Sequence, residues 1–333
     1  MGNCLTAKFL SCLIIGSLGC LLIACHQKDR ESATSKSQSP ATASLIDSVW
    51  IAPDSNQIAQ SPDGEIIQYG RLLISKTAEY FGPHGKIAHT ANGMNCQNCH
   101  LDAGTKPWGN NYGGVFSTYP KYRERRGAIE TIIQRVNDCF IRSLNGKALD
   151  SNSHEMKGIL AYMRWLGKGI PKGKKPYGSG IAEPHLLDRA ADPQKGKLVY
   201  IGKCQRCHGA SGQGVFDTAS VHYRYPPLWG KNSYNSGAGL FRLSRFAGYV
   251  KNNMPFGASY KNTQLTDAEA WDVAAFVNSQ ERPTKVFRED WPKIVQKPYD
   301  HPFGPYVDSF SEQQHKFGPF APIKKSKELA ARK

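Results

Sequence analysis

Two Cys-x-x-Cys-His motifs are the parts of this sequence whose residue types and spacing point most directly to chemistry. In such a motif the two thiols add to the vinyl groups of a haem, and the histidine that follows takes one axial position on the iron. The residues concerned are Cys96, Cys99 and His100 in the first motif and Cys204, Cys207 and His208 in the second. The sequence therefore predicts two covalently bound haem c groups, each with one axial position left open.

One further cysteine, Cys139, follows the first motif and has no other assignment. The chain has nine cysteines: three lie in the predicted signal peptide, Cys25 follows it directly, and four belong to the haem motifs. Because Cys139 has no disulfide partner left in an oxidising compartment, we expect its thiolate to fill the open axial position of the first haem. A buried, inert cysteine is the alternative. The rival ligands are Met156, Met163, His84, His89 and His154.

For the second haem the open axial position points to a methionine. Met254 is the only methionine after Met163, and it lies just before the last predicted helix, where cytochrome c domains place their axial methionine. Lys251 is an alternative ligand if its amine loses its proton, and Asn253 belongs to the same loop.

Basic residues accompany Cys139. Arg135 lies four positions before it and Arg142 three positions after it, so on a helix both share its face. Guanidinium groups in such places stabilise a thiolate and can hold an oxyanion by two hydrogen bonds. Arg125, in a basic run just upstream, and Lys106 are further candidates for an anion site. The basic run that contains Arg125 could equally be a solvated basic surface with no role in binding.

The N-terminus predicts export. Lys8 precedes an apolar run from Phe9 to Ala24 that is short for a membrane span. The run ends in Leu22-Ile23-Ala24-Cys25, a pattern similar to a bacterial lipoprotein signal. We therefore expect lipidation of Cys25 and a periplasmic protein anchored to a membrane, with a retained transmembrane helix as the alternative.

Composition narrows the range of partners. The formal net charge of +16 favours small anionic substrates through electrostatic steering. No nucleic acid partner is expected for an exported haem protein. The hydrophobic fraction of 40% is low for a globular chain, but buried porphyrins supply apolar surface of their own.

Helices must position these groups. Apolar residues recur at helical spacing over 66–74, 128–144 and 152–166 around the first motif, and over 192–201 and 266–277 around the second. This places Cys139 near the C-terminal end of a helix. The expected N-caps are Asn152, Asp192 and Thr266. Residues 104–119, rich in glycine, asparagine and aromatic side chains, are expected to form a loop against the haem.

The predicted fold class is mainly α, with two tandem cytochrome c domains, long loops and an irregular C-terminal extension. The expected boundaries are 1–24 for a signal peptide, 25–48 for a flexible tether, 49–168 for the first domain, 169–191 for a linker, 192–282 for the second domain and 283–333 for the extension. In each domain the haem motif is followed by a loop and a closing helix, which is a weak internal repeat.

Residues 60–282 resemble the dihaem thiosulfate dehydrogenases, some of which act as tetrathionate reductases. The similarity is carried by the segments Met94–His100, Arg135–Phe140, Arg142–Gly146 and Lys251–Pro255. A haem motif alone is not specific, whereas the Asn-Asp-Cys-Phe segment at this distance from it is.

The resemblance implies the reaction and the ligands. His100 and Cys139 would ligate the first, catalytic haem, and His208 and Met254 the second, which passes electrons onward. Two thiosulfate dianions would join to tetrathionate with release of two electrons, or the reverse. A cytochrome c or a quinone-linked protein would be the electron partner.

Two other functions remain open at this point. A plain dihaem electron carrier would use methionine at both open axial positions. The haem subunit of a multi-protein sulfur-oxidising system also has a cysteine-ligated haem, although the lipid anchor and the second haem fit that function less well.

Overall fold

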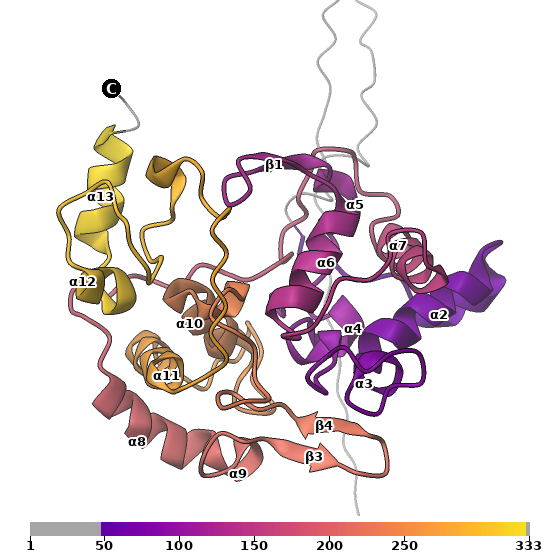
Figure 1. The fold of residues 1–333 in the computed structure, drawn as a ribbon, viewed down its shortest axis with the longest axis horizontal. Helices are drawn as coiled ribbons and strands as arrows, with labels where there is room; N and C mark the ends of the chain where they lie inside the picture. Colours follow the sequence, from indigo (N-terminus) through magenta and orange to yellow (C-terminus); the bar gives the residue numbers. More distant parts are fainter. Residues whose placement is uncertain (1–47, 331–333) are drawn as a thin grey trace, which may run out of the picture. The chain divides into compact units, whose positions relative to one another are not determined.

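The computed structural model describes residues 48–330, and helices dominate this part of the chain (Figure 1). The first half contains η1 (Ser55–Gln60), α2 (Gly64–Ser75), α3 (Thr77–Phe81), η2 (Cys96–Asn98), α4 (Leu101–Gly104), α5 (Val115–Thr118), β1 (Lys121–Arg123), β2 (Ala128–Glu130), α6 (Ile132–Arg142) and α7 (His154–Leu166). The second half contains α8 (Pro193–Lys203), α9 (Gln205–His208), β3 (Val215–Asp217), β4 (His222–Tyr225), η3 (Gly239–Phe241), α10 (Leu243–Asn253) and α11 (Asp267–Ser279). The extension adds η4 (Ile294–Gln296), α12 (Glu312–Phe317) and α13 (Ala321–Ala330). The mainly α prediction is confirmed.

Each half is built around two packed helices that a glycine brings into close contact. In the first half α2 packs on α7, and a Cβ atom at Gly70 would stand 1.9 Å from the carbonyl oxygen of Gly158. In the second half α8 packs on α11, and a Cβ atom at Gly196 would stand 1.8 Å from the carbonyl oxygen of Asp272. Only glycine permits backbones to approach so closely. The two halves therefore share one construction.

The helix that carries Cys139 starts later than its periodicity predicts. The expected helix over 128–144 is wrong at its start, because Ala128–Glu130 forms strand β2, which pairs antiparallel with β1. The Thr131 hydroxyl then accepts a hydrogen bond from the backbone N–H of Gln134, whose side chain accepts one from the Thr131 N–H. This capping box sets the first turn of α6. Cys139 lies near the C-terminal end of α6, as predicted.

Most of the predicted helix starts agree with the structure. Helix α7 begins one residue later than expected, because Ser153 rather than Asn152 is the N-cap and accepts a hydrogen bond from the Met156 N–H. The N-caps Asp192 of α8 and Thr266 of α11 are confirmed.

Two segments expected to be loops contain helix. The stretch 104–119 is loop except for the single turn of α5. The segment before Met254, expected to be a loop, is instead the last part of α10, with Met254 as its C-cap. No helix was predicted over α10, although Leu243, Phe246, Ala247 and Val250 recur at helical spacing, and the start of α10 carries no side-chain cap.

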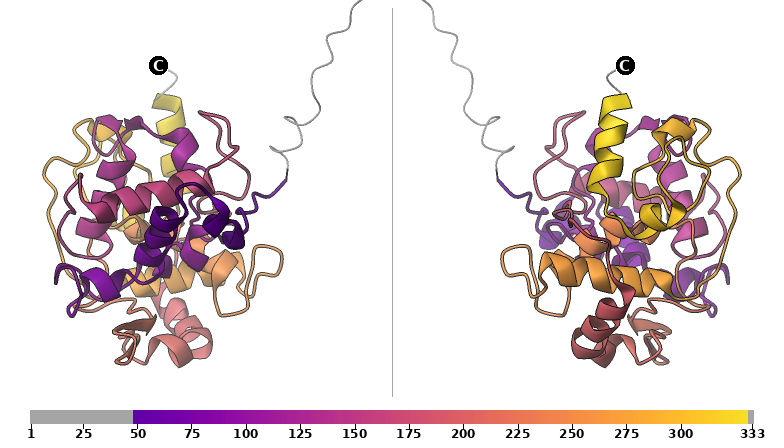
Figure 2. Two further views of the ribbon diagram at one scale, coloured as in Figure 1. Left: turned by 90° about the vertical axis from the view of Figure 1, so that its right-hand side faces the viewer. Right: turned by 90° about the vertical axis from the view of Figure 1, so that its left-hand side faces the viewer.

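The extension is more ordered than its sequence suggested. It contains α12 and α13, and His315, Phe320 and Ile323 within it are buried. In the right-hand view of Figure 2 this yellow and light orange segment faces the viewer.

Between residues 48 and 330 no helix is both long enough and apolar enough to cross a bilayer. The predicted signal peptide and the predicted lipidation site, Cys25, lie outside the described residues.

Candidate active site

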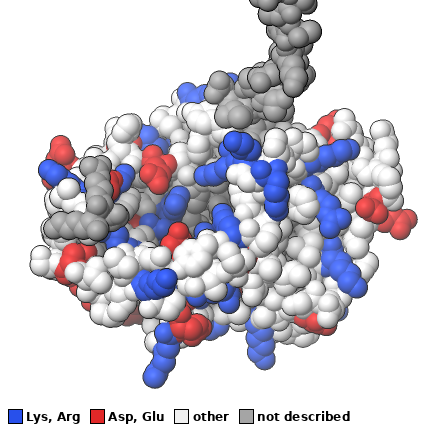
Figure 3. Space-filling model, turned by 90° about the horizontal axis from the view of Figure 1, so that it is seen from above, with Lys and Arg blue, Asp and Glu red and all other residues white. Residues whose placement is uncertain are grey.

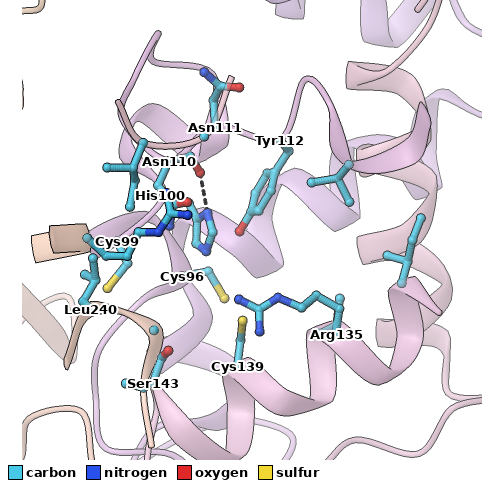
Figure 4. A pocket seen from close by; sticks show the side chains of 18 of the residues that line it. Cys96, Cys99, His100, Asn110, Asn111, Tyr112, Arg135, Cys139, Ser143 and Leu240 are labelled. Atoms are coloured by element: carbon cyan, nitrogen blue, oxygen red, sulfur yellow. Dashed lines mark hydrogen bonds between the residues drawn. The ribbon is translucent and has the colours of Figure 1, made fainter. Parts of the chain in front are cut away.

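A cavity of about 600 Å³ opens beside the first haem motif. Cofactor and ligand sites typically have volumes of roughly 300–1,000 Å³. The lining includes Cys96, Cys99 and His100 of the motif, together with Cys139 of α6 (Figure 4). Other wall residues come from the linker, from η3 and α10, and from the extension. The structure therefore brings Cys139 to the cavity that the first motif borders.

His100 is held in the form that binds a metal. Its Nδ1 lies 2.5 Å from the carbonyl oxygen of Asn110, and because a carbonyl only accepts, Nδ1–H is the donor. Tyr112 stacks on the imidazole with ring centroids 4.4 Å apart. Burial, and to a lesser degree the positive charge of Arg135, lowers the pKa of His100 to about 4. The ring is therefore neutral at pH 7, with Nε2 free to bind iron.

Cys139 and Arg135 point into the same cavity from one face of α6. Figure 4 shows the Cys139 sulfur directed toward Cys96 and His100, with the Arg135 guanidinium beside it. The charge of a Cys139 thiolate raises the pKa of Arg135. Two motif thiols, a neutral imidazole and a further sulfur in one cavity fit a covalently attached haem with a second protein ligand.

Most of the rival ligands lie elsewhere. Met156 is fully buried in the core, His89 bonds through Nδ1 to the carbonyl of Pro83, and His154 stacks on Tyr69. None of these, nor His84, lines the cavity, whereas Met163 does.

The cavity is strongly basic. Of the side chains described by the structure, seven basic ones line it and only one acidic one, Glu124, does. The basic residues are Lys121, Arg123, Arg125, Arg135, Lys175, Arg242 and Arg245. Among residues 48–330, no ion pair within 4.0 Å joins Arg135, Lys121, Lys175 or Arg245 to a carboxylate, although more distant carboxylates attract Arg135 and Arg245. Figure 3, seen from the side of β1, shows Lys and Arg side chains gathered around a hollow.

Two of the predicted anion-binding residues do not reach the cavity. Arg142 is 5% exposed, and its Nη1 and Nη2 donate to the Asp290 carboxylate at 2.8 and 2.7 Å. Although it follows Cys139 by three positions, it turns toward Asp290 of the extension. Lys106 donates instead to the carbonyl oxygen of Ala258. Arg135 and Arg125 do line the cavity.

Sequence reasoning missed the basic residues that other segments contribute. Arg242 and Arg245 come from the start of α10, and Lys175 from the linker. The chain has 43 lysines and arginines, and no local pattern distinguishes these three. Only the packing of the second half and of the linker against the first half brings them to the cavity.

The second motif has a different environment. The Nδ1–H of His208 donates to the carbonyl oxygen of Pro226 at 2.9 Å, and burial lowers the pKa of this histidine, so Nε2 is again free. Met254 is half-buried at the end of α10. The Nζ of Lys251 lies 2.9 Å from Asp267, which holds this amine in an ion pair. Asn253 bonds to the carbonyl of Trp108 in the first half and to that of Tyr249.

Two haem motifs, each with a histidine whose Nε2 is free, define a dihaem cytochrome of the c type. The family model described as cytochrome c matches residues 193–281, and the one described as SoxA/TsdA, cytochrome c domain, matches residues 86–171. The predicted pair of tandem cytochrome c domains and the two covalently bound c-type haems are thereby confirmed.

The chain belongs to the thiosulfate dehydrogenase family. It is 35% identical to the thiosulfate dehydrogenase of Stutzerimonas stutzeri, over 84% of this chain and 87% of that protein. It is 41% identical to that of Allochromatium vinosum, over 68% of this chain and 81% of the relative. The solved structure of thiosulfate dehydrogenase (TsdBA) from Marichromatium purpuratum is similar with a TM-score of 0.65 at 30% identity. That similarity covers 72% of this chain and 51% of the TsdBA chain, so this chain spans about half of that protein's length.

Proposed function

We propose that this protein is a thiosulfate dehydrogenase that can also act as a tetrathionate reductase. Two thiosulfate dianions lose two electrons in total, and one sulfur–sulfur bond forms between them to give tetrathionate. The reverse reaction adds two electrons and breaks that bond. The observation that carries the proposal is the Cys139 thiol pointing, with His100, into a basic cavity.

The ligand sets are part of this proposal. His100 and Cys139 would hold the first haem iron, and His208 and Met254 the second, with Lys251 as a possible alternative to Met254. Haem supplies a one-electron redox centre at each site, so two haems match a two-electron reaction. An anionic thiolate favours the oxidised state, so Cys139 would lower the potential of the first site.

The basic side chains would offset repulsion between substrates. Two dianions about 4 Å apart repel by about 4 kcal/mol in water and by several times more at the lower dielectric constant of a protein surface. Arg135, beside Cys139, and Arg125 would bind the sulfonate oxygens and hold two substrate molecules together.

Thiosulfate and tetrathionate are the expected substrates, and electrons would leave through the second haem to a cytochrome c or a quinone-linked protein. We place the protein in the periplasm. Lipidation of Cys25, the signal peptide over 1–24, the tether over 25–48 and the boundaries 49–168, 169–191, 192–282 and 283–333 remain predictions.

The test is an assay of the purified holoprotein. Thiosulfate should reduce ferricyanide or a cytochrome c, with one tetrathionate formed for every two electrons transferred. A protein with both haems attached that neither oxidises thiosulfate nor reduces tetrathionate would contradict the proposal.

Met163 keeps one alternative open, because this methionine also lines the first cavity. If it were the ligand, both haems would have His/Met ligation, as in a simple electron carrier. Electron paramagnetic resonance of the ferric protein distinguishes the two, since a low-spin thiolate-ligated haem has a signal unlike that of a Met-ligated one.

A further inference from the structure

The C-terminal extension reaches the first haem cavity, far from its own place in the sequence. Trp291, Gln296 and Pro298 line the cavity together with Arg135 and Cys139. The sequence predicted only an irregular extension over these residues. Here it supplies part of the wall of the candidate active site.

Asp290 of the extension lies between two arginines of the first half. Its carboxylate accepts two hydrogen bonds from Arg142, at 2.8 and 2.7 Å, which is the bidentate geometry of a strong ion pair. The same carboxylate lies 4.0 Å from the Nε of Arg125. The side chains of Asp290, Arg125 and Arg142 are only 16%, 14% and 6% exposed, so this cluster is screened little by water.

Arg125 lines the cavity and is held at several points. The backbone N–H of Trp291 donates to its carbonyl oxygen at 2.7 Å, and its Nη1 donates to the carbonyl of Gly237 at 3.1 Å. Its guanidinium lies 5.7 Å from the centre of the Trp291 ring. Because Arg142 takes both short bonds to Asp290, Arg125 is oriented by this carboxylate without being fully neutralised.

The backbone at Trp291 is strained, which supports a functional constraint. Its φ of 62° is uncommon for any residue other than glycine and unfavourable for a bulky one. The conformation is held by the bond to Arg125 and by a bond from the indole Nε1–H to Nε2 of His301, at 3.0 Å.

We propose that Asp290 is a positioning residue for the thiosulfate site, acting through Arg125, and that Trp291 forms the wall against which this guanidinium is held. The inference rests on the proposed function, since it assigns the sulfur oxyanion as the ligand of Arg125. It makes the extension a part of the active site.

Charge and position predict opposite effects for the variant Asp290→Asn. Removing a negative charge near the cavity would, by Coulomb attraction alone, tighten the binding of a dianion and lower the KM for thiosulfate. Loss of the carboxylate also frees Arg142 and removes the restraint on Arg125, which weakens binding and raises the KM. The positioning role predicts the second result.

The experiment compares holoproteins carrying Asp290→Asn and Asp308→Asn. Asp308 is the matched control, because it also lies in the extension and its carboxylate lies 2.9 Å from the Nε2 of His315. Neither His315 nor Phe310, whose N–H donates to Asp308, lines the cavity, whereas Arg125 beside Asp290 does. For Asp290→Asn we expect the KM for thiosulfate to rise about tenfold with little change in kcat, equivalent to roughly 1.4 kcal/mol of binding. For Asp308→Asn the KM should stay within about twofold of the wild type. Haem content and the ferric spectrum should be unchanged in both.

An unchanged or lowered KM in Asp290→Asn would overturn the proposal, as would an equal rise in Asp308→Asn. If Asp290→Asn does not fold, Trp291→Leu serves instead: it keeps an apolar side chain but removes the ring from Arg125, and it should raise the KM severalfold. An unchanged KM in that variant would equally refute the role of the extension. An inactive wild type would refute the proposed function itself, so the two failures are distinguishable.

Discussion

The two haem motifs of this chain lie in similar scaffolds and in different chemical surroundings. In both, a glycine contact joins the helix before the motif to a closing helix, and a backbone carbonyl fixes the histidine through Nδ1. Around the second motif, Lys203 pairs with Glu269 at 2.7 Å and Lys251 with Asp267 at 2.9 Å. Around the first motif, several cationic side chains of the cavity have no ion-pair partner among the described residues. The cavity also contains Cys139, a cysteine outside the haem motif. The comparison indicates that the motif and its scaffold provide haem attachment, whereas the surrounding side chains decide whether a site transforms a substrate or passes electrons.

The largest expected effect comes from making the first site resemble the second. Cys139→Met should retain both haems, because attachment depends on the motif cysteines, but thiosulfate oxidation should fall by about 1,000-fold or more. Haem staining and the rate of thiosulfate-dependent ferricyanide reduction measure the two properties. Met156→Leu, a change of a core methionine away from the cavity, is the control and should keep its activity. A fully active Cys139→Met enzyme would show that Cys139 is not what makes the first site differ in function from the second.

Removing a free charge from the first site should have the next largest effect. Arg135→Gln should lower kcat/KM for thiosulfate by about 100-fold, because the dianions lose a partly buried cation beside Cys139. Arg206→Gln removes an exposed arginine inside the second haem motif and should change this value little when ferricyanide is the acceptor. If kcat/KM for thiosulfate falls equally in both variants, the overall charge of the protein, and not the cavity, attracts the substrate.

A change at the second site should affect turnover and leave substrate binding alone. Met254→Ala removes the expected axial ligand of the exit haem, so kcat should fall by roughly tenfold while the KM for thiosulfate stays the same. The ferric spectrum should keep the thiolate-ligated signal and lose the Met-ligated one. A changed KM would mean that the two sites are not separate in function.

The smallest effects should come from the caps of the equivalent helices. Ser153→Ala at the start of α7 and Thr266→Ala at the start of α11 each remove one side-chain cap, and each should lower the free energy of unfolding by about 1 kcal/mol. Denaturant unfolding of the holoprotein measures both. If the free energy of unfolding falls severalfold more in one variant than in the other, the two scaffolds are not equivalent.

Local patterns allowed much of the fold to be predicted. The helices α2, α7, α8 and α11 follow from apolar periodicity, and the last three also from N-caps predicted at, or one residue before, the observed ones. The start of α6 was placed too early, because Ala128–Glu130 fits a helical period equally well and only pairing with β1 makes it a strand. Helix α10 was missed because tertiary contacts, rather than a local cap, stabilise its first turn: the Ser244 N–H donates to buried Asp300.

The candidate site was only partly predictable. The position of Cys139 on α6 placed Arg135 beside it, since one helical turn separates them. The same reasoning placed Arg142 at the site, and it failed because helical spacing gives a direction but not the neighbour found there. Asp290 binds that guanidinium, and no local pattern connects Asp290 to it.

By itself the sequence determined where the haems attach, because a Cys-x-x-Cys-His motif contains all its reacting groups within five consecutive residues. It also determined that one cysteine was left over for another use. Apart from Arg135, which lies one helical turn away, only the tertiary structure decided which charges surround that cysteine. Arg245, Lys175 and Trp291 reach the first cavity through contacts between segments far apart in the chain, and such contacts depend on the packing of the whole molecule.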